Sequence, residues 1–204
     1  MSTVAYDKPV RAWQRMLSGR RLDLLSPSPD DIEIEDIAHG LARVARWNGQ
    51  TIGPHAFSVA QHSLLVADIA EALNPDFSTP FRRAALLHDA PEYVIGDLIS
   101  PFKAALGLDY KAFEMRLLAA IHVRFAIPQA LPENVTQAIK DADRIAAFYE
   151  AIGLAGFSHA EAETFFGVPN IAADSIKHLR AITPLSARDA QQQFLKRFAI
   201  LQGL

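Results

Sequence analysis

Apolar residues recur at intervals of three and four along most of this chain of 204 residues, and that spacing marks one face of an α-helix. Residues 34–44 show it, as does the run that follows Ser58 and ends before Asn74. Ser58 is a good N-cap residue, so a helix is predicted to begin there. The same spacing predicts further helices over residues 79–95, 109–125, 133–152, 158–166 and 186–201. We therefore predict an all-α fold.

Alternation typical of β-strands is confined to the beginning of the chain. Residues 21–25 and 31–34 alternate, and the turn-forming sequence Pro-Ser-Pro-Asp lies between them, so a small hairpin is predicted. The length fits one domain with its own core. We divide it into an N-terminal arm (residues 1–33), a helical core (34–155) and a C-terminal helical extension (156–204) that packs on the same domain.

Composition excludes several kinds of site. The chain has no cysteine, which rules out disulfides, thiolate metal sites, iron–sulfur clusters and a cysteine nucleophile. The net charge of −3 gives no reason to expect binding to a nucleic acid polymer. The first residues lack the pattern of a signal peptide, and no uncharged run reaches the ~20 apolar residues that span a bilayer. We expect a cytoplasmic protein that does not contact membranes.

Polar residues stand at positions where the helical pattern predicts apolar core residues: His62, the adjacent pair His88 and Asp89, and Asp143. One histidine on an apolar face is more often a hydrogen-bonded core residue than a metal ligand. Two imidazoles and two carboxylates on three helices, however, match a six-coordinate divalent metal ion with positions left for water. Mixed nitrogen and oxygen donors suit Mn²⁺, Fe²⁺, Co²⁺, Ni²⁺ or Zn²⁺ better than Mg²⁺. Helix spacing does not choose among these ions.

Glu92 lies four residues after His88 and three after Asp89, on a neighbouring part of the same predicted helical surface. A carboxylate near a metal ion can orient a bound water or carry its proton. The alternative is an exposed glutamate at a helix end. Pro91 removes a backbone donor and is expected to kink or end the helix before Glu92.

The ordered set His62, His88-Asp89 and Asp143 resembles the ligand set of the HD-domain superfamily of metal-dependent phosphohydrolases. That superfamily has a helical fold and is named for its His-Asp pair. The resemblance implies a helical bundle, and it implies metal-ligand roles for these four residues.

Residues 88–97 carry the pattern His-Asp-x-x-Glu-x-x-x-Gly-Asp, which is similar to the bacterial 5′-deoxynucleotidase branch of that superfamily. Those enzymes remove phosphate from deoxynucleoside 5′-monophosphates, typically as homodimers with one metal ion per subunit. The resemblance implies the same assembly here, with one divalent ion per subunit, whether Mn²⁺, Co²⁺, Fe²⁺, Ni²⁺, Zn²⁺ or Mg²⁺. It also implies that Glu92 helps to position the attacking water and that Asp97 lies on the sugar side of the substrate.

Arg46-Trp47 stands where this branch has an Arg-Trp pair upstream of the first metal histidine, with the arginine on the phosphate. A guanidinium fork suits phosphate geometry, and an indole could flank the sugar or base. The loop at residues 48–55 departs from the sequence typical of the branch, and residues 19–25 and 36–39 resemble a phage-like subset of it. The identity of the substrate therefore stays open.

These patterns predict a metal-dependent phosphohydrolase that acts on a small nucleotide, with the 5′-phosphate of a (deoxy)nucleoside monophosphate as the leading substrate. A nucleoside triphosphohydrolase or a phosphodiesterase would use the same metal site on a different ester. A triphosphohydrolase is expected to need several basic residues at its site, and few lie near these motifs. The remaining alternative is that the protein is not an enzyme but a non-catalytic module that binds a nucleotide or a metal ion.

Overall fold

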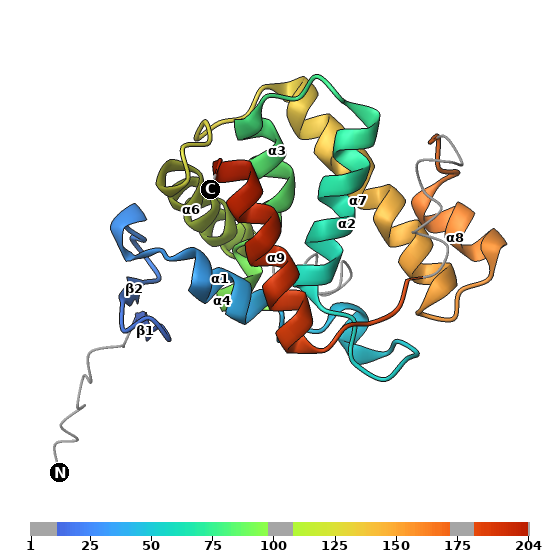
Figure 1. Cartoon of the computed structure of the whole chain (residues 1–204), viewed down its shortest axis with the longest axis horizontal. Coiled ribbons are helices and arrows are strands. Elements are labelled where there is room, and N and C mark those ends of the chain that lie inside the picture. The colour runs from blue at the N-terminus through green and yellow to red at the C-terminus, as the bar shows by residue number, and fades with distance from the viewer. Residues whose placement is uncertain (1–11, 98–107, 172–181, 204) are drawn as a thin grey trace, which may run out of the picture.

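Helix α2 (Val59–Leu73) is the element against which helices from distant parts of the chain pack in the computed structural model, which describes residues 12–97, 108–171 and 182–203 (Figure 1). Its ends are set locally, as predicted. The Ser58 hydroxyl accepts a hydrogen bond from the backbone N–H of Gln61 at 3.3 Å, and the helix ends at Asn74. Helices α3 (Thr79–Leu86), α7 (Glu133–Gly153) and α9 (Ala187–Gln202) all contact α2.

The other elements complete an all-α fold with one small hairpin, which confirms the predicted fold class. In chain order they are β1 (Trp13–Arg15), β2 (Arg21–Asp23), the 3₁₀ turn η1 (Pro29–Asp31), α1 (Ile34–Leu41), the turn η2 (Arg46–Gly49), α4 (Glu92–Ile95), α6 (Leu108–Arg124) and α8 (His159–Phe166). The hairpin and α8 lie at opposite ends of the molecule (Figure 1). The proposed divisions at residues 33 and 155 stay predictions, and parts of both flanking segments lie outside the described residues.

The hairpin forms, but with a different partner strand from the one predicted. β2 pairs antiparallel with β1, so that Gln14 lies opposite Leu22, whereas residues 31–34 contribute no strand. Pro29 instead enters the 3₁₀ turn η1, and Ile34 begins α1. The connection between β1 and β2 contains Gly19 at φ 90°, a backbone conformation that glycine adopts without strain. Leu22 is fully buried and fixes the hairpin on the helices.

The predicted helix over residues 79–95 is interrupted, and the interruption carries the His-Asp pair. α3 ends at Leu86 and α4 begins at Glu92, so His88 and Asp89 lie in the tight turn between two helices rather than on a helix face. The N–H of Glu92 donates to the carbonyl of Asp89 at 3.0 Å within this turn. Pro91 explains the break, because it lacks an N–H and disfavours helical geometry at the residue before it.

Helix α1 ends at Leu41, short of the predicted end at residue 44, and the chain then runs beside the start of α2. The N–H of Val59 donates to the carbonyl of Val44 at 3.0 Å, and the N–H of Arg46 donates to the carbonyl of Phe57 at 2.8 Å. This short antiparallel contact places Arg46 beside the first turns of α2.

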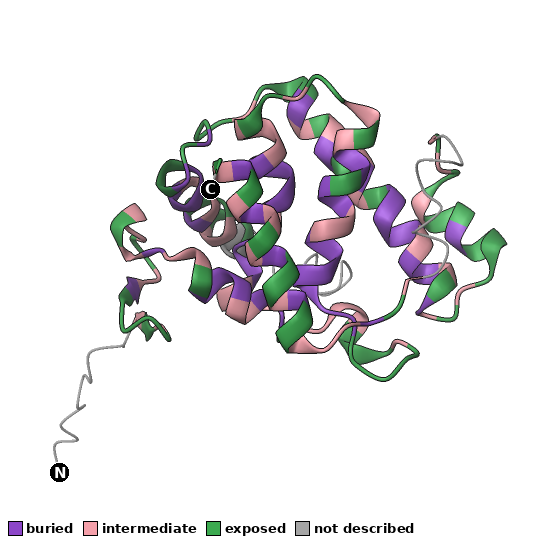
Figure 2. Cartoon of the chain, viewed as in Figure 1, coloured by how far each residue is buried: buried purple, intermediate pink, exposed green. Residues whose placement is uncertain are grey.

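The buried residues lie mainly where the helices pack against one another (Figure 2). The N-terminal half of α2 is almost entirely buried, whereas α8 and the hairpin are mostly exposed. Phe194 on α9 and Phe148 on α7 are among the largest fully buried side chains. Among the described residues, no helix combines the length and the apolar composition that a membrane span requires.

Helices α1 and α4 approach each other closely at Gly40, because glycine has no side chain there. A side chain at this position is therefore expected to destabilise the fold. A Cβ at Gly40 would lie 2.7 Å from the Cβ and 3.1 Å from the Cα of Tyr93, so Gly40→Ala forces α4 to move. We expect a loss of about 1–3 kcal/mol in the free energy of unfolding, measured by urea titration. The control is Gly153→Ala, because a Cβ there meets no described atom within 4 Å. Equal stability of the two variants would contradict this packing.

Candidate functional site

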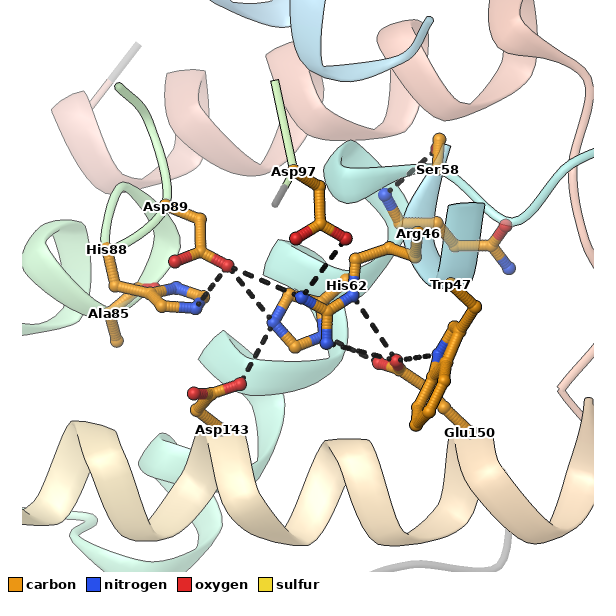
Figure 3. Close-up of polar contacts among 11 residues, drawn as sticks. Arg46, Trp47, Ser58, His62, Ala85, His88, Asp89, Asp97, Asp143 and Glu150 are labelled. Atoms are coloured by element: carbon orange, nitrogen blue, oxygen red, sulfur yellow. Dashed lines mark hydrogen bonds and ion pairs between the residues drawn. The ribbon is translucent and has the colours of Figure 1, made fainter. Parts of the chain in front are cut away.

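Four separate parts of the chain bring polar side chains to one place (Figure 3). His62 comes from α2, the His88-Asp89 pair from the turn before α4, and Asp143 and Glu150 from α7. Arg46 comes from the turn η2. The first turns of α2 are buried in the core, so His62 has a side chain with 0% exposure in a position that packing fixes.

The two histidines present their Nε2 atoms toward the same space. The Nδ1 of His62 lies 2.5 Å from Glu150 Oε1, and the Nδ1 of His88 lies 2.9 Å from the carbonyl oxygen of Ala85. Ionised carboxylates and carbonyls only accept, so each Nδ1 is the donor. A neutral imidazole then has its lone pair on Nε2. Among the described residues, neither buried Nε2 has a hydrogen-bond partner.

Two carboxylates lie at ion-pair distance from these nitrogens. Asp89 Oδ2 is 3.4 Å from His62 Nε2 and 3.1 Å from His88 Nε2, and Asp143 Oδ1 is 3.2 Å from His62 Nε2. One donor atom from each of His62, His88 and Asp143 lies within 4.8 Å of the other two, close enough together to hold a metal ion. The unsatisfied Nε2 atoms and the nearby oxygens therefore fit a divalent cation with mixed nitrogen and oxygen ligands.

Asp143 and Asp97 differ from His62 in exposure. The helical pattern predicted a core position for Asp143, but its side chain is 43% exposed and lies at the open side of the cluster. Asp97 lies just after α4, and its side chain is 9% exposed. Its Oδ2 lies 3.8 Å from Arg46 Nη1. Both carboxylates therefore belong to the cluster, one at its rim and one inside it.

The charges in the site shift one another's pKa. Burial and the guanidinium of Arg46 oppose a charge on His62, but the carboxylates of Glu150, Asp143 and Asp89 outweigh them and raise its pKa well above the ordinary value. Burial works against ionised Asp89, yet the two histidines hold its pKa well below the usual range. The pKa of Asp143 is lowered as well, because the contact with His62 overcomes the effect of burial.

Arg46 divides its guanidinium between two sides of the site. Its Nε and Nη2 lie 3.4 Å and 3.2 Å from Glu150 Oε2. Its Nη1 faces the other way, 3.9 Å from Asp89 and 3.8 Å from Asp97. These last distances are too long for hydrogen bonds, so Nη1 keeps donor capacity on the side of the histidine cluster.

Trp47 joins the site through its N–H rather than through an open ring face. Its Nε1 donates to Glu150 Oε2 at 2.9 Å, and its ring packs against Phe157 and Phe166 with centroids 5.6 Å and 6.0 Å away. The predicted contact of this indole with a sugar or base stays a prediction. Trp47 and Asn48 have φ values of 56° and 51°, in the left-handed region that costs a non-glycine residue roughly 1–2 kcal/mol.

Glu92 is buried at the first turn of α4, with a relative exposure of 1%. The sequence also allowed an exposed glutamate at a helix end, and that alternative is wrong. The turn that contains His88 and Asp89 leads directly into this helix, which keeps Glu92 within one turn of the pair.

Glu150 is the member of the site that the sequence patterns did not single out. It is fully buried and contacts His62, Arg46 and Trp47. Its pKa is lowered to about 2, because Arg46 and His62 outweigh the effect of burial. A signal existed, since Ile139, Asp143, Ala146 and Glu150 follow one another at intervals of four, three and four on one face of α7.

Comparisons with known proteins agree with this architecture. The model of a family described as 5′-deoxynucleotidase YfbR-like matches residues 36–184. The uncharacterized protein RCAP_rcc00048 of Rhodobacter capsulatus is 61% identical over 160 residues, which cover 78% of this chain and 82% of that protein. The uncharacterized protein YfdR of Escherichia coli K12 is 28% identical over 190 residues, 93% of this chain and 96% of that protein.

The family match spans α1 to α8 and continues into the segment before α9, so it includes every residue of the cluster described above. Families of this kind are metal-dependent phosphohydrolases, in keeping with the cation-binding geometry. The chain belongs to the YfbR-like 5′-deoxynucleotidase family of the HD-domain superfamily.

Proposed function

We propose that this protein hydrolyses the 5′-phosphate ester of a (deoxy)nucleoside monophosphate with one divalent metal ion held by His62, His88, Asp89 and Asp143. The observation that carries the proposal is the orientation of the two imidazoles. Both Nδ1 atoms are bound to acceptors, which leaves both Nε2 atoms available on the other side of the rings. There, both Nε2 atoms lie near Asp89, and the Nε2 of His62 also lies near Asp143. Neutral imidazole and carboxylate together are suitable ligands for Mn²⁺, Fe²⁺, Co²⁺, Ni²⁺ or Zn²⁺.

The residues around this cluster divide the remaining tasks. A bound divalent ion would lower the pKa of water and neutralise charge on the phosphoryl group. Arg46 presents Nη1 toward the cluster, where it can donate to phosphate oxygens. Glu92 would orient the attacking water and accept its proton as the new P–O bond forms. The P–O bond to the sugar would then break, and the proton held by Glu92 would pass to the departing sugar oxygen. Asp97, whose Oδ2 lies 3.8 Å from Arg46 Nη1, would accept a hydrogen bond from the sugar.

The supply of positive charge favours a monophosphate. Arg46 is the one guanidinium in ion-pair contact with the cluster within the part of the chain that the structure describes. The cluster itself holds the carboxylates of Asp89, Asp97 and Asp143. A triphosphate would bring more negative charge than this arrangement offsets, unlike the single phosphate of a nucleoside monophosphate.

The direct test is hydrolysis of a panel of nucleotides, followed both by release of inorganic phosphate and by chromatography of the nucleoside and nucleotide products. The purified protein is stripped with a chelator and reloaded separately with Mn²⁺, Co²⁺, Fe²⁺, Ni²⁺, Zn²⁺ or Mg²⁺. It is then offered 5′-monophosphates with ribose and deoxyribose, 3′-monophosphates, triphosphates and a dinucleotide diester. We expect inorganic phosphate from the 5′-monophosphates alone. Hydrolysis restricted to triphosphates or diesters would overturn the substrate proposal, and hydrolysis of none would favour a binding module.

Two variants separate metal binding from proton transfer. His88→Ala should lose both the metal ion and the activity, because it removes a nitrogen ligand. Glu92→Gln should keep the metal ion and lower kcat by roughly 10²–10⁴-fold, the usual contribution of general base catalysis. Metal content by mass spectrometry and initial rates give the two readouts.

The control for the histidine change is His159→Ala, because that side chain is 68% exposed on α8. It should retain metal and activity. Activity in metal-free His88→Ala protein would contradict the mechanism, as would unchanged turnover in Glu92→Gln.

We also expect a homodimer with one metal ion per subunit, which the family resemblance implies. Light scattering combined with metal quantification measures both numbers on the same sample.

A further inference from the structure

We propose that Glu150 is a positioning residue that ties the imidazole of His62 and the guanidinium of Arg46 into one unit, and so fixes the phosphate-binding arginine relative to the metal-binding cluster. This inference rests on the proposed function, because it assigns His62 to the metal ion and Arg46 to the phosphate. It concerns a residue for which the family pattern quoted above gives no role. The carboxylate touches neither substrate nor metal in this assignment and acts through its neighbours.

The two oxygens of Glu150 serve different partners (Figure 3). Oε1 lies 2.5 Å from His62 Nδ1, and Oε2 accepts hydrogen bonds from Arg46 Nη2 at 3.2 Å and Trp47 Nε1 at 2.9 Å. The side chain of Glu150 has no exposure to solvent, so water does not compete for these contacts. One buried carboxylate therefore links α2 and η2 to α7.

The contact with His62 determines which nitrogen can bind a cation. Because the carboxylate accepts, the proton stays on Nδ1 and the lone pair of the neutral ring lies on Nε2, on the side of Asp89 and Asp143. A carboxylate on the remote nitrogen also makes the ring a stronger donor, and loss of such partners typically weakens metal affinity 10–100-fold.

The contact with Arg46 determines which edge of the guanidinium remains available. Glu150 engages Nε and Nη2, which leaves Nη1 directed toward Asp89 and Asp97. Trp47 reinforces this arrangement, because its N–H binds the same oxygen while its ring is held by Phe157 and Phe166. The side chains of Arg46 and Trp47 reach the same carboxylate although they are adjacent in the chain, and the backbone is left-handed at Trp47.

A purely structural ion pair is the competing interpretation, and it makes different predictions. A structural pair changes the stability of the fold when it is broken, but it leaves the metal affinity and the KM of the folded protein alone. A positioning residue changes both, and each through a different partner.

The experiment uses the full-length protein and three variants. Glu150→Gln keeps the shape but cannot accept from His62, Arg46 and Trp47 at once, because one oxygen becomes an N–H₂ donor. Trp47→Phe preserves the aromatic packing and removes one donor to Oε2. Glu161→Gln replaces the charged acceptor in the capping box of α8 by a neutral one and is the matched control, since Glu161 contacts Ser158 and lies outside the cluster.

Metal affinity is measured by calorimetric titration of Mn²⁺ into chelator-treated protein without substrate. Glu150→Gln should weaken it 10–100-fold, whereas Trp47→Phe and Glu161→Gln should match the wild type. Steady-state kinetics with a 5′-monophosphate should show a raised KM for both Glu150→Gln and Trp47→Phe. The two changes combined should raise KM by less than the product of the separate factors.

The outcomes separate this inference from the proposed function. Wild-type metal affinity and KM in folded Glu150→Gln would overturn the positioning role, even in an active enzyme. If no phosphate ester is hydrolysed, the proposed function fails, and the Mn²⁺ titration still decides the role of Glu150 at His62. If Glu150→Gln does not fold, Glu150→Asp and Trp47→Phe replace it. A wild-type KM in Trp47→Phe together with wild-type metal affinity in Glu150→Asp would then overturn the inference.

Discussion

A carboxylate without any exposure to solvent lies where α7 meets α2 and the turn η2, and its need for partners shapes that region. An ionised group buried without partners costs several kcal/mol, roughly, so Glu150 requires donors from its surroundings. His62, Arg46 and Trp47 supply them from two other parts of the chain. These elements can therefore not shift relative to one another without exposing or unpairing a buried charge. The contacts that arrange the site also hold this part of the fold together.

The α-helix makes this arrangement possible with few residues. Asp143 and Glu150 are seven positions apart, close to two helical turns, so both point from α7 toward α2. Asp143 Oδ1 lies 3.2 Å from one nitrogen of His62 and Glu150 Oε1 lies 2.5 Å from the other. Two residues on one face of α7 thus contact the two nitrogens of a single imidazole. Because His62 itself is packed in the core, neither its rotamer nor its ring orientation has room to vary.

What the sequence predicts well is local, and what it misses depends on distant contacts. The ends of α2 follow from Ser58 and Asn74. The convergence of His62 with the His-Asp pair is a distant contact that the family resemblance implied, since the pair lies in a turn and not on the helix face that the spacing predicted. The strand partner of β2 did not follow, because pairing depends on which segment the turn at Gly19 brings alongside. Glu150 was missed for a related reason: a glutamate on an apolar face becomes meaningful only once its three donors are known to surround it.

The charge balance of the site explains why its two sides behave differently. Glu150 is compensated by Arg46 and by the Nδ1 proton of His62, and its lowered pKa keeps it ionised at any ordinary pH. The Nε2 side faces Asp89 and Asp143, whose charges raise the pKa of His62. Under the proposed ligand roles, a proton and a divalent ion compete for that nitrogen, as they do wherever neutral imidazole binds metal. The Glu150 side is then the fixed side of the ring, and all exchange of cations takes place on the side that faces the substrate.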